Sequence, residues 1–198
     1  LLNKEFPKAQ LSGGLESSVG GLIGDEFTKA ALIAIGLSII GIGVYISLRY
    51  EFTFALSSIL ALAHDVIIAL GIFLATGRTV SLTVVAALLT VIGYSINDTV
   101  VVFDRIREYH HLYPKRDDLE VTDSALNSTL RRTFSTSLST LVVLLAIFIF
   151  GGTSIKGFVF ALLIGIIVGT YSSLFVATPL AYEFRKRFGK KETTVVKK

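Results

Sequence analysis

Five long apolar blocks, separated by short polar segments, dominate this sequence of 198 residues. The hydrocarbon core of a bilayer is about 30 Å thick, and a helix needs about 20 consecutive apolar residues to cross it. Each block reaches that length or comes close to it. We expect spans at residues 28–48, 52–76, 80–104, 129–150 and 157–182. The sequence therefore predicts an all-α membrane protein, built as a bundle of five transmembrane helices.

Composition and motifs argue against an enzyme. Charged residues make up only 17% of the chain, whereas soluble domains carry about 25%. Cysteine is absent, which excludes disulfides, thiol nucleophiles and cysteine-based metal sites. The sequence also lacks a phosphate-binding P-loop, a nucleophile elbow and a cluster of metal ligands. We therefore expect a membrane subunit that is no enzyme and binds no cofactor, metal or nucleic acid.

Lysine and arginine divide unevenly between the two ends of the predicted bundle. Arg78 and Lys156 fall at one end, with Lys4 and Lys8 before the first span. The basic residues of the other end are Arg49, Arg105, Arg107, Lys115, Arg116, Arg131 and those from Arg185 to Lys198. Cytosolic loops of membrane proteins carry an excess of Lys and Arg. We therefore expect the second end in the cytosol and the segment before the first span outside.

The same reading divides the chain into three parts. Residues 28–184 form the transmembrane domain, and its one long connection is a cytosolic loop at about 105–128. Residues 1–27 lead into the membrane from the outer side. Residues 185–198 form a basic cytosolic tail, whose lysines we expect to meet anionic lipid of the bilayer.

Three charged residues stand out within the predicted spans. A charge at this depth costs about 2.5–3.5 kcal/mol on insertion scales, so each one asks for an explanation. At 1.5 Å per residue, Asp65 lies about 16 Å from the outer face, near mid-membrane. Asp98 and Arg132 both lie about 27 Å from that face, on consecutive spans. Their similar depth makes an ion pair between Asp98 and Arg132 a reasonable hypothesis.

Polar residues gather around these charges. Ser95, Asn97 and Thr99 flank Asp98 in its span. The hydroxyls that follow Arg132 include those of Thr133, Thr136 and Ser137.

Such hydroxyls hydrogen-bond helices together or line a thin water path. We interpret Asp98, Arg132, Asp65 and Asn97 as ion-coupling residues, and the neighbouring hydroxyls as the lining of the path. The alternative is that the charges only tie helices together or fix topology.

Several segments resemble the SecF branch of the SecD/SecF family of protein-export membrane proteins. The most specific is Gly-Tyr-Ser-Ile-Asn-Asp-Thr-Val-Val-Val-Phe-Asp-Arg-Ile-Arg-Glu at 93–108. Leu-Ala-His-Asp at 62–65, Leu-Arg-Arg-Thr-Phe-Ser-Thr-Ser at 130–137 and the glycine-rich segment at 19–27 agree with it. The resemblance covers nearly the whole chain.

The resemblance implies an RND-type bundle that corresponds to spans two to six of a SecF half. The first helix of the family pattern and nearly all of its periplasmic domain are missing, so residues 1–27 are expected to be the end of that domain. By similarity, the family's essential acid falls on Asp98 and its essential arginine on Arg132.

The implied function is to couple a proton or sodium gradient to preprotein translocation across the bacterial cytoplasmic membrane. The implied partners are SecD, separate or fused upstream, the SecYEG channel, YidC and unfolded preprotein. The N-terminal end of this chain would be periplasmic and its C-terminus cytosolic.

Two other functions stay open at this point. The chain could be a passive scaffold that stabilises SecYEG and YidC, in which case Asp98→Asn is tolerated and bulky substitutions at Gly165 or Gly169 break the complex. An RND-type exporter of small molecules is the third reading, and the specific match around Asp98 disfavours it.

Overall fold

The computed structural model describes the backbone of residues 14–188 and the side chains from residue 24 onward. Over this range the chain is almost entirely helical. Its elements are α1 (Gly14–Arg49), α2 (Phe52–Ala75), α3 (Leu82–Leu112), α4 (Asp118–Phe150), α5 (Thr153–Ser172), the π-helix η2 (Ser173–Ala177) and α6 (Thr178–Phe188). Because α5, η2 and α6 form one continuous span, five helices are long and apolar enough to cross a membrane. The predicted fold class is confirmed.

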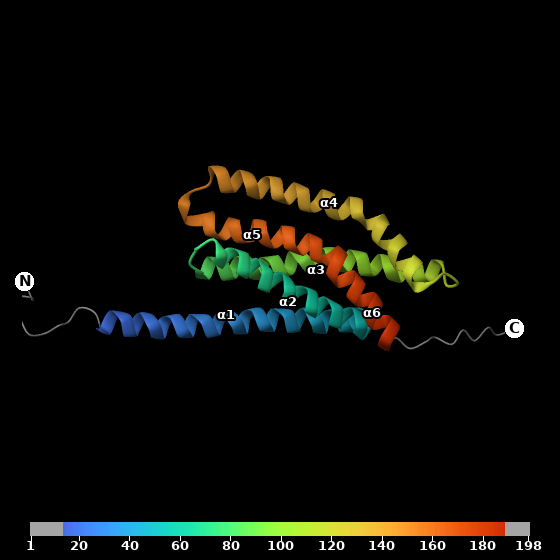
Figure 1. Ribbon diagram of the computed structural model, residues 1–198, viewed down its shortest axis with the longest axis horizontal. Helices are drawn as coiled ribbons and strands as arrows, with labels where there is room; N and C mark the ends of the chain where they lie inside the picture. The colour runs from blue at the N-terminus through green and yellow to red at the C-terminus, as the bar shows by residue number, and fades with distance from the viewer. Residues whose placement is uncertain (1–13, 189–198) are drawn as a thin grey trace, which may run out of the picture.

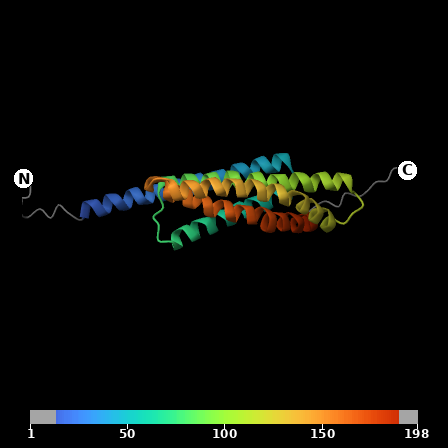
Figure 2. The same ribbon diagram turned by 90° about the horizontal axis from the view of Figure 1, so that it is seen from above.

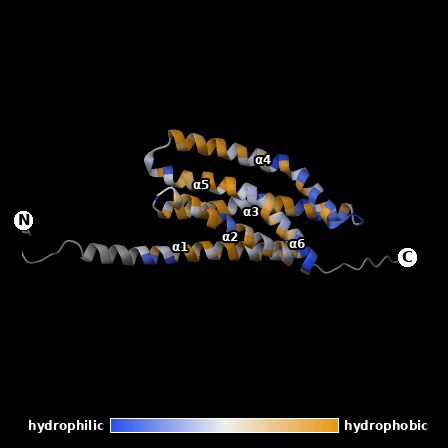
Figure 3. Ribbon diagram, in the orientation of Figure 1, coloured by the Kyte–Doolittle hydropathy of each residue, from blue (hydrophilic) through white to orange (hydrophobic). Residues whose placement is uncertain are grey.

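The five spans lie side by side and run alternately up and down (Figures 1 and 2). We call the end that holds the turn at 50–51, the loop at 113–117 and the close of α6 the basic end, and the other the opposite end. α3 and α5 form the most extensive helix pair and are the most buried, whereas α1 and α4 are mostly exposed. Figure 3 shows hydrophilic residues gathered at the basic end, on α3, α4 and α6.

Two glycines on α5 let it approach α3 closely. A Cβ atom added at Gly165 would lie 2.1 Å from Cγ2 of Val91, and one at Gly169 would lie 3.0 Å from Cβ of Ser95. Contacts below 3.0 Å are essentially never seen for real Cβ atoms. Glycine is therefore required at 165 for this packing, as expected for small residues at helix interfaces in membranes.

An aromatic and ionic cluster fastens the basic end. The Tyr50 hydroxyl donates to Asp104 Oδ1 at 2.7 Å, and its ring packs edge-on against Phe54 and Phe103. Burial and the hydrogen bond to Asp104 raise the pKa of the Tyr50 phenol. The phenol therefore stays protonated at neutral pH, and it anchors the turn between α1 and α2 to α3.

Several helices extend beyond the expected spans. α1 already runs from Gly14, inside the segment expected as a lead-in. Most of the connection expected at 105–128 is helical, because α3 continues to Leu112 and α4 begins at Asp118. Apolar length predicts only the part of a helix that crosses the membrane. Polar residues continue a helix outside it, and here the Asp117 carboxylate caps α4 by accepting from the Leu119 amide at 3.3 Å. Residues 1–13 and 189–198, which include most of the expected basic tail, lie outside the described residues.

Candidate ion-coupling site

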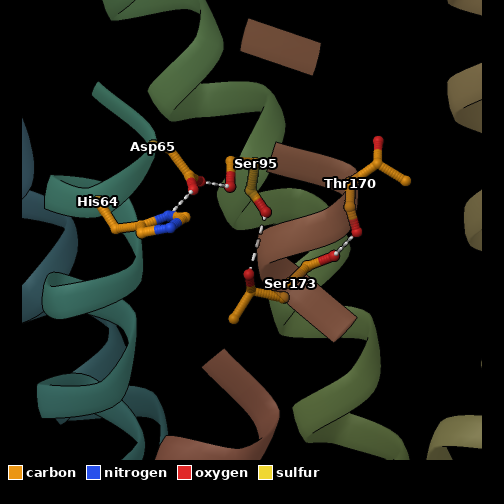
Figure 4. Close-up of polar contacts among 6 residues, drawn as sticks. His64, Asp65, Ser95, Thr170 and Ser173 are labelled. Carbon is orange, nitrogen blue, oxygen red and sulfur yellow. Dashed lines mark hydrogen bonds and ion pairs between the residues drawn. The ribbon is translucent and has the colours of Figure 1, made fainter. Parts of the chain in front are cut away.

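A fully buried carboxyl group lies in the middle of the bundle. Asp65 on α2 is 0% exposed. Its Oδ2 atom accepts a hydrogen bond from Ser95 Oγ of α3 at 2.6 Å, and its Oδ1 atom lies 3.1 Å from Nδ1 of the partly exposed His64. Figure 4 shows His64 and Asp65 pointing from α2 toward Ser95. Each carboxyl oxygen therefore has a polar partner, as a buried polar group requires.

The second buried carboxyl group belongs to Asp98, which lies on α3 one turn after Ser95. Its side chain is 4% exposed, and its Oδ2 atom accepts from Ser137 Oγ of α4 at 3.4 Å. Ser137 Oγ in turn accepts from Thr170 Oγ1 of α5 at 2.7 Å. This chain of polar groups joins three helices across the interior of the bundle.

Both carboxyl groups lie beside one stretch of α3, because Asp65 is hydrogen-bonded to Ser95 of that helix and Asp98 belongs to it. Ser95 and Asp98 are three residues apart, so both lie on the same side of that helix. The Thr99 hydroxyl donates to the Ser95 carbonyl at 3.1 Å. Thr133, one turn before Ser137 on α4, is 1% exposed, and its hydroxyl has no hydrogen-bond partner among the described residues. The interior thus holds two acids and a set of hydroxyls, the composition from which proton relays are built in membranes.

The structure does not bring all the predicted residues into this interior. Arg132 lies exposed on α4, and no ion pair joins it to Asp98 in the described part of the chain. Asn97 and Thr136 are exposed as well, and the Thr136 hydroxyl donates only to backbone carbonyls of its own helix. The charge of Arg132 still acts on the Asp98 carboxyl, so the two residues lie in one region of the bundle without an ion-pair contact.

Thr170 is the site residue that the sequence did not single out. It lies in an apolar span whose glycines attracted attention instead. Its position one residue after Gly169, on the span that packs against Asp98's helix, was the signal that could have found it.

We expect Ser95→Ala to destabilise the bundle by about 1–3 kcal/mol, because it leaves a buried oxygen of Asp65 without its donor. The substitution keeps Cβ, so the packing against Gly169 is unchanged. Thermal unfolding in detergent, compared with Ser81→Ala at an exposed position, measures the effect. Equal melting temperatures for the two variants would contradict the assigned hydrogen bond.

Fold and site together define a multi-span helical membrane protein with ionisable groups buried in its interior. The family described as "Protein export membrane protein SecD/SecF, C-terminal" matches residues 3–187 of this chain. The chain belongs to this family, and the resemblance seen in the sequence is confirmed.

Relatives and solved structures agree with that assignment. The chain is 43% identical over 192 residues to protein translocase subunit SecF of Rhodothermus marinus, covering 94% of this chain and 62% of the relative. It is 52% identical over 163 residues to the same subunit of Vibrio alginolyticus, covering 82% and 52%. The chain thus spans little more than half the length of these relatives.

The crystal structure of SecDF from Thermus thermophilus, a translocon-associated membrane protein, superposes with a TM-score of 0.79 at 42% identity. The match covers 84% of this chain and 23% of that one. SecDF in its super-membrane-facing form superposes with a TM-score of 0.71 at 43% identity, covering 79% and 21%.

Proposed function

We propose that this chain forms the last five spans of a SecF subunit that couples an ion gradient to preprotein translocation across the bacterial cytoplasmic membrane. The observation that carries the proposal is Asp98, a carboxyl group that is 4% exposed inside an apolar bundle. It accepts from one hydroxyl, that of Ser137, and makes no ion pair within the described residues, although the charge of Arg132 acts on it. A buried acid whose charge is opposed by burial and supported by one hydroxyl and one cation that is not in contact is suited to take up and release a proton.

The coupling step follows from this arrangement. When Asp98 takes up a proton, its charge is lost and the helices around it are free to move. When it ionises, Ser137 donates a hydrogen bond to the Asp98 carboxylate, and Thr170 donates to Ser137. A charge that crosses the membrane potential yields about 2.3 kcal/mol per 100 mV, sufficient to bias such a rearrangement. Asp65 acts as a second proton-binding group, and its carboxyl oxygens contact His64 and Ser95.

The position of Arg132 supports a partner subunit against α4. An arginine exposed on an apolar span costs several kcal/mol unless it meets an acid or water. Val143, eleven residues further along and therefore on the same face of the helix, is also exposed. We assign this face to SecD, whose acidic groups would pair with Arg132. Asn97 is exposed on α3. SecYEG, YidC and unfolded preprotein complete the set of proposed partners.

Orientation is part of the same proposal. The basic end lies in the cytosol, in agreement with the excess of Lys and Arg there. The N-terminal end of the chain is then periplasmic and its C-terminus cytosolic, as in a multi-pass protein of the inner membrane.

The test uses sealed vesicles that carry the complete SecD–SecF complex with SecYEG. Preprotein release and ion flux are measured with a proton gradient, with a sodium gradient and with both collapsed. We expect release to rise with one gradient and to be accompanied by flux of that ion. Release that is identical in all three conditions would overturn gradient coupling and leave the scaffold function.

A further inference from the structure

A seam of small and hydroxyl-bearing residues runs from Asp65 to the basic end, between α2 and the last span. On α2 the seam includes Thr53, Ser57, Ser58 and Ala61, none more than 6% exposed. α2 packs there against the end of α5, η2 and α6. At 1.5 Å per residue, the seam is about 18 Å long from Asp65 to Thr53.

The register of the two antiparallel helices places more hydroxyls opposite this face. Ala69 of α2 shares one apolar cluster with Ile164 of α5, and Val168 packs against that cluster. Ala61 shares the next cluster with Leu174 and Ala177. Ser172, one turn after Val168, therefore lies between the levels of Asp65 and Ser58. Around the helix it falls between Val168 and Gly165, and Gly165 packs against α3, so Ser172 lies on the side between α2 and α3.

Two hydroxyls of the seam have no partner in the part of the chain that the structure describes. The Oγ1 atom of Thr53 and the Oγ atom of Ser172 are fully buried and make no hydrogen bond among the described residues. Residue Ser172 is 0% exposed and Thr53 is 6% exposed. A buried hydroxyl without a partner costs about 1–3 kcal/mol, so such groups are regularly satisfied by water.

The remaining seam hydroxyls are arranged to accept hydrogen bonds. Ser57 and Ser58 both donate to the Phe54 carbonyl, and Ser173 donates to the Thr170 carbonyl. Each donor is used within its own helix, so the oxygen lone pairs remain for another molecule. Thr178 donates to the Ser173 carbonyl across the π-helix η2, and π-helical turns of this kind are frequent at functional sites.

We propose that this seam is a water path that connects Asp65 with the basic end of the bundle. The ligand is water and, with it, an excess proton, because hydroxyls in a row accept and pass hydrogen bonds, whereas hard metal cations such as Ca²⁺ and Mg²⁺ take about six oxygen ligands around one point. At the mouth of the path Arg185 Nε lies 3.8 Å from Glu51 Oε2. The competing reading is a dry contact in which small side chains only let the helices approach.

The proposed function is needed only to explain what the path is for, namely the delivery of a proton to Asp65. Water access itself is independent of coupling and is tested without any transport assay. The described chain has no native cysteine, so single cysteines are informative once the partner subunits have been freed of theirs. Ser58→Cys and Ser172→Cys exchange one oxygen for sulfur on the seam, and assembly of each complex is verified by size exclusion.

Thiols in sealed vesicles are exposed to silver ions, and the unreacted fraction is then counted with a fluorescent maleimide after denaturation. A thiol reacts as the thiolate and only where water reaches it, so we expect both seam cysteines to react at least about tenfold faster than Ala55→Cys. Ala55 is the matched control, since it is 2% exposed, nearer the basic end than Ser58, and packed in an apolar cluster.

Equal, slow reaction at all three positions would overturn the water path. If either seam variant fails to assemble, the labelling rate of Thr53→Cys tests water access at the basic end of the path. The outcome is separable from the proposed function. Fast labelling without ion flux overturns coupling but keeps the path, and flux without labelling removes only the path.

Discussion

Vesicles that carry Asp98→Asn should show no gradient-stimulated preprotein release, while their release without a gradient should match that of the unmodified complex. Asparagine fills the same space and can still accept from Ser137, but it cannot exchange a proton. The gradient then has no group to load, so both the ion flux and the stimulated release are lost. Flux and release are measured together in the same vesicles, after assembly has been verified.

Asp123→Asn is the matched control for this substitution. This substitution makes the same chemical change at an exposed position on α4, away from the buried acids. We expect the gradient to stimulate preprotein release fully in this variant. If the gradient also stimulates release fully in Asp98→Asn, the buried acids only hold helices together, and the scaffold function is favoured.

Gly165→Ala should be the most destabilising small substitution in the bundle. Its new Cβ would meet the Val91 side chain at 2.1 Å, and a β-branched side chain in a packed helix has little freedom to turn away. Overpacking of this kind costs about 1–3 kcal/mol. The free energy of unfolding, or the melting temperature in detergent, measures the loss.

Two further variants separate this clash from the general effect of alanine in a helix. Gly36→Ala adds a Cβ with nothing within 4 Å, so it should be neutral or stabilise by up to about 1 kcal/mol. Combining Gly165→Ala with Val91→Ala removes the clashing methyl groups and should restore part of the lost stability. A melting temperature for Gly165→Ala equal to that of Gly36→Ala would contradict the close contact.

The sequence was sufficient for the fold because the dominant constraint is one-dimensional. Apolar length determines which segments cross a bilayer, so five helices and their alternating direction follow directly from the blocks. Helix ends were less predictable. The extension of α3 to Leu112 and the early start of α4 depend on helix propensity and capping outside the membrane, where hydropathy carries no information.

For the site, the sequence located the unusual groups but not their neighbours. Asp65 and Asp98 were evident as acids in apolar spans, and both are buried. The link from Ser137 to Thr170 and the exposure of Arg132 depend on how each helix is rotated in the bundle. The rotation of each helix about its axis is determined by packing among all the spans, so it cannot be predicted from the sequence of one segment.

The π-helix η2 takes up one residue of the last span without turning the helix that follows it. Its wider turn accommodates one residue more than an α-helix would over the same rise. Removing one residue between 173 and 177 would return the segment to α-helical spacing and leave the residues after it on their present faces. Thr178 and Ala181 would then stay buried, and Arg185 would stay beside Glu51. The same deletion elsewhere in the span would rotate everything after it by about 100°. A lost residue is thus absorbed at the π-helix and is a change of phase anywhere else along the span.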